Sequence, residues 1–312
     1  MSREHVIDAS RIHHDWDETL QPILAIESGD VVHFDLLEAG NGQVKLGDTF
    51  ADVTFDFDTL YNLSGPITVA GAEPGDTLAI DILELTHGSW GWTAILPGFG
   101  LLPDDFPDGH VRTFDITGTD AADFTADISI PLRPFMGVMG VQPGGGAKLS
   151  PFPPHAGGGN IDNRHLIAGS RLYLPVFLTG ALFSCGDPHA VQGDGEVCVS
   201  ALEGPLRGSL RFTLQKRSIP TPAFVTAPRE PEGLGSEYCT MGIASELMEG
   251  ARMATRAMIA WLGDEHGLSP VDAYMLCSLA GKLKILEIVD AGMWNVGMCM
   301  PLALFSDSAA RR

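Results

Sequence analysis

The sequence predicts a mainly β protein with a smaller α+β part at its C-terminal end. Of the 312 residues, 37 are glycine and 21 are proline, whereas only 19 are lysine or arginine. That composition provides many tight turns and few solvated helical faces, which favours a β-rich architecture. Residues 20–215 show short strand patterns, and helical periodicity is confined to the residues that follow. We therefore divide the chain into a β-rich body, residues 1–215, and an α+β part, residues 216–312.

The strands of the body are separated by turn signals. Ile23–Ile26 and Val31–Leu37 flank a Glu-Ser-Gly-Asp turn, and residues 66–70 and 77–85 flank a Pro-Gly turn. In the last of these segments apolar residues alternate with polar or small ones, which is typical of a strand with one buried face. Further strands are expected at 127–135, 171–183, 197–202 and 206–214.

Two helices and two strands are predicted in the C-terminal part. A strand at Phe224–Thr226 precedes Ile243–Leu262, whose apolar residues recur at helical spacing and which Gly263 is expected to end. The second helix has Ser269 as its N-cap, proline at its first position and glycine as its C-cap. Residues 282–289 then alternate as a strand.

The densest group of polar residues follows the segment 173–183, which is apolar nearly throughout. It contains three carboxylates and a histidine within ten residues, interrupted by glycines. These residues are Asp187, His189, Asp194 and Glu196, with Glu203 after one more predicted strand. One histidine with several carboxylates is a ligand set for a divalent ion. A few ligands in tetrahedral coordination would favour Zn²⁺, and a larger number would favour Ca²⁺. The alternative is a surface turn with solvated acids.

A second polar group begins at His155 and includes three consecutive glycines, Gly157–Gly159. Glycines of this kind let the backbone approach a ligand or another strand closely. His155, Asp162 and His165 are candidate metal ligands, or groups that orient a ligand. The same segment could instead be a flexible loop.

Charge and composition exclude several classes of function. The formal net charge of −21 repels phosphate backbones and anionic lipid surfaces, so we expect neither nucleic-acid nor membrane binding. Because no apolar leader and no membrane-spanning segment is present, we expect a cytoplasmic protein. The five cysteines form no Cys-x-x-Cys pair, and we expect them to be reduced, buried thiols.

Several segments resemble motifs of the acetamidase/formamidase family. Residues 63–76 read LSGPITVAGAEPGD and resemble its SGPI-V-GA-PGD stretch, and residues 158–163 read GGNIDN and resemble its GGN-D motif. Residues 172–197 resemble the longest block that the family shares, and residues 14–16 with 27–31 fit its N-terminal end. The resemblance covers most of residues 10–300.

This resemblance implies a metal-dependent amide hydrolase with a β-sandwich body and a small α+β C-terminal part. The substrates that it implies are small linear amides such as formamide and acetamide, which would yield ammonia and a carboxylate. Two alternatives stay open: a non-catalytic metal- or sugar-binding β-sandwich, and a family member that acts on another C–N bond.

The resemblance and the polar groups together suggest roles for individual residues. We expect a divalent ion, Zn²⁺ or Ca²⁺, to be held by Asp187 and His189 with help from Asp162 or His155. The candidate general bases are Glu203, Glu196 and Asp194, with Glu203 favoured because burial at a strand end would raise its pKa. The candidate oxyanion-binding groups are Gly158, Gly159 and Asn160.

The C-terminal part is too apolar for its size to cover its own surface. The Met-rich helix at 243–262, the strand at 283–289 and the apolar residues 294–300 all lie in this part. We therefore expect a homodimer or a higher homo-oligomer, with the C-terminal part completing the body and forming the interface.

Overall fold

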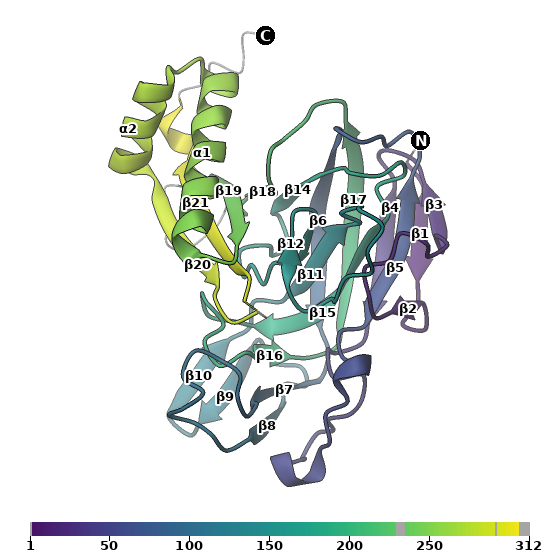
Figure 1. Cartoon of the computed structure of the whole chain (residues 1–312). Helices are drawn as coiled ribbons and strands as arrows, with labels where there is room; N and C mark the ends of the chain where they lie inside the picture. Colours follow the sequence, from purple (N-terminus) through teal and green to yellow (C-terminus); the bar gives the residue numbers. More distant parts are fainter. Residues whose placement is uncertain (1, 229–234, 291, 306–312) are drawn as a thin grey trace.

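The computed structural model describes residues 2–228, 235–290 and 292–305. Two large β-sheets dominate it, and the mainly β fold class is confirmed (Figure 1). The first sheet has nine strands, in the order β1 (Glu4–Ile7), β4 (Val31–Leu36), β17 (Leu206–Gln215), β6 (Thr77–His87), β14 (Arg171–Pro175), β18 (Ala223–Val225), β19 (Glu237–Ala244), β21 (Trp294–Pro301) and β20 (Lys282–Glu287). The C-terminal strands therefore continue the sheet that begins in the body.

The second sheet has ten strands and carries most of the polar residues singled out above. Its main path is β12 (Pro154–His155), β13 (Gly158–Asn160), β11 (Phe135–Val141), β15 (Phe183–Val191), β16 (Leu202–Glu203), β7 (Trp90–Ile95) and β8 (His110–Asp115). β5 (Leu63–Val69) pairs with β15 and also with β2 (Ile12–His13) and β3 (Leu24–Ile26). A separate hairpin is formed by β9 (Ala121–Thr125) and β10 (Ile128–Pro131).

The main hydrophobic core lies between the two large sheets. Ile80 and Phe212 from the nine-stranded sheet and Met139 and Phe183 from the ten-stranded sheet belong to one buried cluster. Alternate residues of β17 are buried and exposed, as their two-residue period predicts. This packing of one sheet on the other makes the body a β-sandwich.

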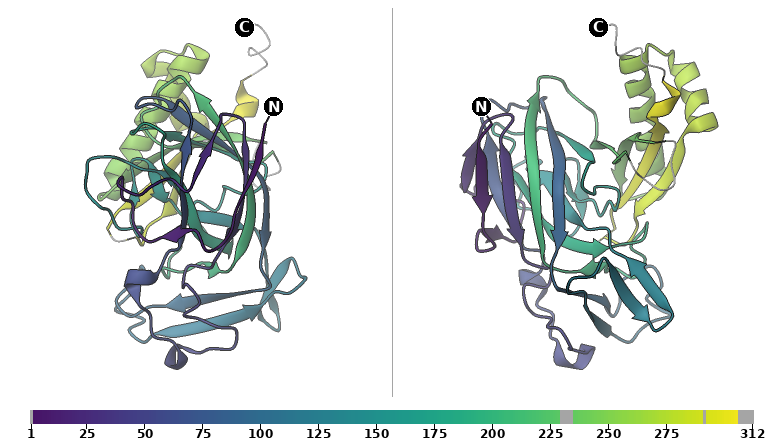
Figure 2. Two further views of the ribbon diagram at one scale, coloured as in Figure 1. Left: turned by 90° about the vertical axis from the view of Figure 1, so that its right-hand side faces the viewer. Right: turned by 180° about the vertical axis from the view of Figure 1, so that it is seen from behind.

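The C-terminal helices lie together on the side of the molecule away from the N-terminal strands (Figures 1 and 2). α1 (Leu247–His266) and α2 (Pro270–Ala280) bury Met258 and Ala273 in a second cluster with residues of β19 and β21. Among the described residues, neither helix is long and apolar enough to cross a membrane. Three short 3₁₀ helices, Phe50–Asp52, Phe57–Thr59 and Leu302–Leu304, complete the regular structure.

The limits of the first helix differ from those predicted. Residues 243–244 end β19, a strand buried on both faces whose apolar run resembles helical spacing. The helix also continues through Gly263 and ends at Gly267, which takes the left-handed backbone conformation (φ 67°) that glycine adopts readily. The caps of the second helix are confirmed, because the Ser269 hydroxyl accepts the backbone N–H of Asp272.

Three strand predictions are wrong. Residues 127–135 contain the short strand β10 and then only the first residue of β11. Residues 171–183 form no single strand, because the chain leaves the nine-stranded sheet after Pro175 and enters the ten-stranded sheet at Phe183. The connection is mostly apolar because Val176 and Ala181 are buried in the main core, and Ala181 and Leu182 take positive φ angles there. Residues 197–201 form turns rather than a strand.

Candidate active site

The polar residues that follow Phe183 are part of a strand rather than a loop. β15 carries Asp187 and His189 two positions apart, so both side chains lie on one face of the sheet. Both side chains are buried. Asp187 has a φ of 51°, an uncommon backbone conformation for a residue other than glycine in a strand.

Glu203 reaches the same place from the neighbouring strand. It is the register partner of His189 across the β15–β16 pair. Its Oε1 accepts the backbone N–H of Ala201 at 2.9 Å, which leaves Oε2 directed at the histidine. His189 Nε2 lies 3.2 Å from Glu203 Oε2 and 3.2 Å from Asp187 Oδ2, without hydrogen-bond geometry to either.

Gln192 orients the imidazole of His189. Its Oε1 lies 2.9 Å from His189 Nδ1, and its amide nitrogen donates to the carbonyl of Asp162 at 2.8 Å. Because the amide oxygen only accepts, Nδ1 carries a proton. In the neutral imidazole Nε2 would then present a lone pair toward two carboxylates, which is an arrangement that suits a shared cation.

Asp162 joins the cluster from the end of β13. Its backbone N–H and that of Ile161 both donate to the carbonyl of Gly137 on β11, each at 3.2 Å. Its Oδ1 lies 3.8 Å from His189 Nδ1. Two groups of possible ligands share His189. One group adds Asp162 and Glu196, and the other adds Asp187 and Glu203. Within each group, the ligand atoms lie within 4.8 Å of one another.

Two further carboxylates come from the C-terminal part of the chain. Glu287 ends β20, and its Oε1 accepts the backbone N–H of Asp290 at 2.6 Å. Asp290 in turn accepts the side-chain amide of Asn160 at 2.8 Å. Sequence reasoning missed both acids because they follow the other acids by about a hundred positions in the chain. A β-bridge between Gly195 and Glu287 brings the end of β20 beside the loop that carries Glu196.

Burial keeps these acids from ionising together. Desolvation and neighbouring carboxylates raise the pKa of Asp162 to about 6 and that of Glu287 to about 8, and they raise the pKa values of Glu196 and Asp290 well above the ordinary range. Desolvation likewise raises the pKa of Asp187 to about 6. Concentrated, water-excluded negative charge of this kind is stabilised by a cation.

The pKa of His189 is also raised, but by the neighbouring charges rather than by burial. Burial by itself lowers the pKa of His189, but the adjacent Glu203 and Asp187 carboxylates outweigh that effect and hold it well above its ordinary value. His189 is therefore the one positive group that the described cluster itself supplies.

The cluster contains buried polar atoms that no hydrogen bond satisfies. They are Asp162 Oδ1, Asp187 Oδ1, His189 Nε2, Glu203 Oε2 and Glu287 Oε2. Native proteins rarely leave such atoms unpaired, because an unsatisfied buried polar group costs free energy. Carboxylate oxygens and an imidazole nitrogen are also ligands that Zn²⁺ accepts, so the donor set fits a divalent metal.

Gly137 lies beneath the converging side chains. A Cβ atom at this position would lie 2.6 Å from Asp187 Oδ2 and 2.9 Å from His189 Cε1, and it would also overlap Asp162. Glycine is therefore required here, because any larger residue would occupy the space between the carboxylates.

A cavity of about 350 Å³ opens beside the cluster. Its lining includes the carboxyl groups of Glu203 and Asp290, and the rest of its wall is mainly apolar. The aromatic side chains are Phe55, Phe57, Tyr61, Trp92, Phe99 and Phe152. An apolar cavity with a few converging polar groups is typical of a binding site for a small molecule.

Three sequence-predicted candidates, Asp194, His155 and His165, lie outside the groups of converging ligand atoms. The Asp194 side chain is 40% exposed, and its carboxylate lies 3.3 Å from His165 Nε2 and 3.4 Å from Arg164. His155 packs edge-on against Trp16 and accepts the backbone N–H of Gly157. Burial lowers the pKa of His155 to about 4, so the ring is neutral at pH 7.

The predicted oxyanion-binding residues form the short strand β13. Gly158 and Gly159 pair in antiparallel register with Gly140 and Met139 of β11. The side-chain amide of Asn160 donates to Asp290 and to the carbonyl of Phe152 at 3.0 Å. Asn160 thus links the acidic cluster to the wall of the cavity.

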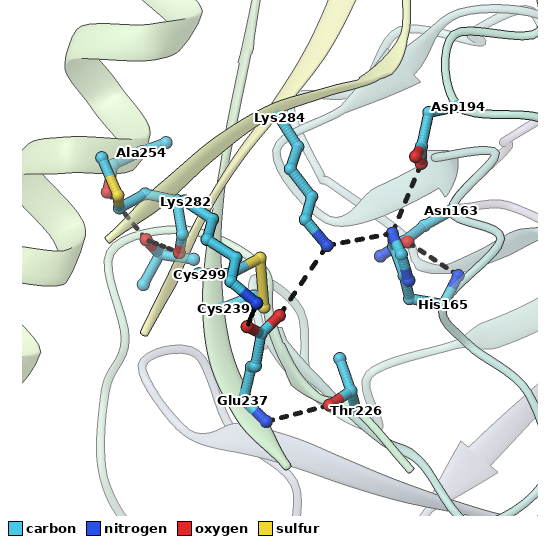
Figure 3. The surroundings of a disulfide bond; sticks show 12 residues. Asn163, His165, Asp194, Thr226, Glu237, Cys239, Ala254, Lys282, Lys284 and Cys299 are labelled. Carbon is cyan, nitrogen blue, oxygen red and sulfur yellow. Dashed lines mark hydrogen bonds and ion pairs between the residues drawn. A yellow bond between two sulfur atoms is a disulfide. The ribbon is translucent and has the colours of Figure 1, made fainter. Parts of the chain in front are cut away.

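The expectation that all cysteines are free thiols is wrong for one pair. Cys239 and Cys299 are register partners on the antiparallel strands β19 and β21, with 4.0 Å between their Cα atoms, and they form a disulfide (Figure 3). The chain separation of 60 residues hides this proximity from the sequence. Cys185 is a buried free thiol, and desolvation raises its pKa, which argues against a role as nucleophile.

Two lysines of β20 flank this disulfide. Lys282 Nζ lies 2.5 Å from Glu237 Oε1, and Lys284 Nζ lies 3.7 Å from Glu237 Oε2 and 3.5 Å from His165 Nε2 (Figure 3). His165 in turn lies beside Asp194, so these contacts attach strand β20 to the loop that carries Asp194 and Glu196.

Known proteins are similar to this chain in sequence. The Acetamidase/Formamidase family model matches residues 1–150 and 145–307. The formamidase of Methylophilus methylotrophus is 29% identical over 71% of this chain and 69% of that protein. The acetamidase of Mycolicibacterium smegmatis is 28% identical over 80% of this chain and 78% of that protein.

Solved structures show the same fold. A crystal structure of acetamidase from Bacillus halodurans has a TM-score of 0.87 at 29% identity, covering 96% of this chain and 98% of that one. A predicted acetamidase/formamidase from the thermophile Thermoanaerobacter tengcongensis has a TM-score of 0.88 at 26% identity, covering 100% of both chains.

Proposed function

This chain belongs to the Acetamidase/Formamidase family and is an amidase, and we propose that it hydrolyses small linear amides such as formamide and acetamide with the help of a divalent metal ion. In the reaction the C–N bond of the amide breaks, a C–O bond to the oxygen of water forms, and the products are a carboxylate and ammonia. The observation that carries the proposal is the pair of buried carboxylate–histidine groups that share His189 beside a cavity.

The residues that would hold the ion are Asp187, His189 and Glu203, or Asp162, His189 and Glu196. The imidazole favours Zn²⁺ over Ca²⁺, because Ca²⁺ is bound almost entirely by oxygen ligands. A bound divalent ion supplies Lewis acidity, which polarises the amide carbonyl and makes water a nucleophile at neutral pH.

The protein's own groups then position the reactants and move the proton. When Asp162, His189 and Glu196 hold the ion, Glu203 is the best candidate for the general base, because its Oε2 makes no hydrogen bond while its Oε1 is held by the Ala201 N–H, and the residue borders the cavity. A carboxylate in this position can take the proton from the attacking water and return it to the leaving amine. Gln192 keeps the imidazole of His189 in one orientation throughout.

Ammonia release from formamide and acetamide, measured before and after chelation, tests the proposal. We expect turnover by the purified protein, loss of turnover after chelation, and recovery when Zn²⁺ is returned. Elemental analysis should find about one equivalent of metal or more per chain, and Asp187→Asn should lose it. A metal-free protein that is fully active would contradict the metal-dependent part, and absence of turnover on every amide would contradict the whole proposal.

We also propose that the C-terminal part mediates self-association. α2 and β20 expose a set of large apolar side chains, and Leu279 is the most exposed at 84%. The set comprises Val271, Tyr274, Met275, Leu279, Leu283 and Ile285. Exposed large apolar side chains that are concentrated on two adjoining elements commonly mark a protein–protein interface.

A further inference from the structure

The cavity beside the acidic cluster is built around fixed aromatic rings. The indole of Trp92 is buried, and its N–H donates to Glu38 at 2.8 Å. Glu38 also accepts the backbone N–H of Gly40, and its own carbonyl accepts the side-chain amide of Asn62 at 3.1 Å. These bonds hold the indole in one orientation, so that wall of the cavity is formed before any ligand binds.

The opposite wall consists of rings that pack on one another. Phe152 contacts Tyr61 edge to face at 4.7 Å between centroids, and it contacts Phe57 at 6.3 Å. Phe57 stacks on Phe99 at 5.6 Å, and both of these rings are partly exposed at the rim. Burial, together with the nearby carboxylates of Asp187 and Asp290, raises the pKa of Tyr61, so this side of the cavity lies close to the acidic cluster.

The cavity is larger than formamide or acetamide requires. Its volume of about 350 Å³ lies within the range of sites for drug-sized ligands, roughly 300–1,000 Å³. Since one water molecule occupies about 30 Å³ in the liquid, acetamide, whose acyl group ends in a single methyl, would leave most of this space to water. Water against aromatic walls is unfavourable, and an apolar group that displaces it gains binding free energy.

The charge of the lining restricts the ligand further. The described residues around the cavity include two ionisable carboxyl groups, Glu203 and Asp290, and no lysine, arginine or histidine. Away from the acidic cluster, an anionic group would therefore find no basic side chain to pair with. A neutral, apolar group suits the aromatic part, while the polar end of the ligand lies toward Glu203.

We propose that the preferred substrates of this amidase are primary amides with an aromatic or similarly bulky apolar acyl group, of about the size of phenylacetamide. The proposal rests on the amidase function proposed above, because the acyl group fills the aromatic cavity only if the amide carbon lies at the acidic cluster. Hydrolysis converts such an amide and water into ammonia and the arylalkyl carboxylate, with cleavage of the C–N bond and formation of a C–O bond.

The first test compares substrates on the metal-loaded full chain. Values of kcat/KM are measured for formamide, acetamide, butyramide, benzamide and phenylacetamide by ammonia release. We expect phenylacetamide to exceed acetamide by ~10-fold or more, because each methylene buried in an apolar pocket contributes a factor of about ten or more. If acetamide is turned over and phenylacetamide is a poorer substrate, the inference is overturned while the proposed function stands. If no amide is turned over, both are overturned.

The second test changes the cavity. Phe152→Ala removes an aromatic wall and Leu96→Trp reduces the space, and both should lower the ratio of kcat/KM for phenylacetamide to that for acetamide by ~10-fold. Phe106→Ala is the matched control: Phe106 is exposed, lies outside this cavity, and should leave the ratio unchanged. Circular dichroism and thermal melting establish that each variant is folded. A ratio that neither cavity variant moves would overturn the assignment of the cavity to the acyl group.

Discussion

His189 is the residue on which the candidate site depends most. Its two nitrogens face different groups: Nδ1 faces Gln192, and Nε2 faces the carboxylates of Asp187 and Glu203. This division explains why one histidine suffices among so many acids. A single oriented nitrogen can serve as a ligand while the acids supply the remaining donors.

The role of Glu203 can be separated from that of a structural acid. Glu203→Gln keeps the oxygen that accepts the Ala201 N–H but removes the charge and the proton-accepting ability of Oε2. We expect turnover of acetamide to fall by ~10²-fold or more, which is the usual contribution of a general base. Turnover, metal content and melting temperature are measured together. An unchanged rate would assign the base to another carboxylate, with Glu196 the next candidate.

Gly137 offers a test of the space between the carboxylates. Gly137→Ala should abolish metal binding and turnover, because the added Cβ would lie 2.6 Å from Asp187 Oδ2. Gly193→Ala is the matched control, since it has no atom within 4 Å of the added carbon and its φ is not positive. Both variants are assayed for metal content and ammonia release. A Gly137→Ala protein with full metal content and activity would contradict the geometry described above.

At the scale of elements, one buried acid attaches the N-terminal strand to the sandwich. Asp30 precedes β4 and accepts the backbone N–H groups of Arg3 at 2.8 Å and Glu27 at 3.0 Å. The Arg3 N–H bonds Oδ1, whereas the Glu27 N–H bonds Oδ2, which the His5 ring also contacts at 3.0 Å. Burial alone would raise the pKa of Asp30, but these hydrogen bonds outweigh it and lower the pKa to about 2.

The depressed pKa of Asp30 makes this attachment depend on pH. Because the folded-state pKa of about 2 is below the ordinary value of 3.8, its contribution is fully present above pH 4 and is lost as pH falls toward 2. We expect Asp30→Asn to lower the free energy of unfolding by about 2 kcal/mol at pH 7. About half of that difference from the native chain should remain at pH 3. Urea unfolding of the native chain and of Asp30→Asn at a series of pH values measures this difference in the free energy of unfolding. A difference that does not vary with pH would contradict the low pKa assigned to Asp30.

At the scale of the whole molecule, the C-terminal part has two faces with different roles. One face brings Glu287 and Asp290 to the acidic cluster beside Asp162. The other exposes the apolar side chains of α2 and β20. A partner subunit bound there would buttress the β20 strand that ends at the site.

Self-association through that face is directly measurable. Light scattering at micromolar concentration should give at least twice the chain mass of 33.2 kDa. Leu279→Glu places a charge at the leucine with the greatest exposure and should shift the protein toward monomer. Leu46→Glu is the control: Leu46 is half-exposed and lies outside the C-terminal part, so its replacement should leave the oligomeric state unchanged. A native protein that scatters as a monomer would contradict the proposed interface.

Much of the candidate site could be predicted from local sequence. Asp187 and His189 lie in one short segment, and their two-residue spacing places both on one face once the segment is a strand. Glu196 and Asp162 were within reach of the same reasoning, because each follows a glycine-rich polar run. Asp194 belongs to the same run, yet it lies outside the converging ligand atoms, since a loop residue can point to either side of the backbone.

The alternation of the strands, the caps of α2 and the polar content of the segment around β15 are predictable from local sequence, because they depend on residues that are neighbours in the chain. Which distant residues meet depends on the folded arrangement. Three features arise from pairing between strands that are far apart in the sequence. They are the crossing between sheets after Pro175, the Cys239–Cys299 disulfide, and the approach of Glu287 and Asp290 to the site. Such contacts are set by how two sheets bury their apolar faces against each other, and no local pattern encodes that choice.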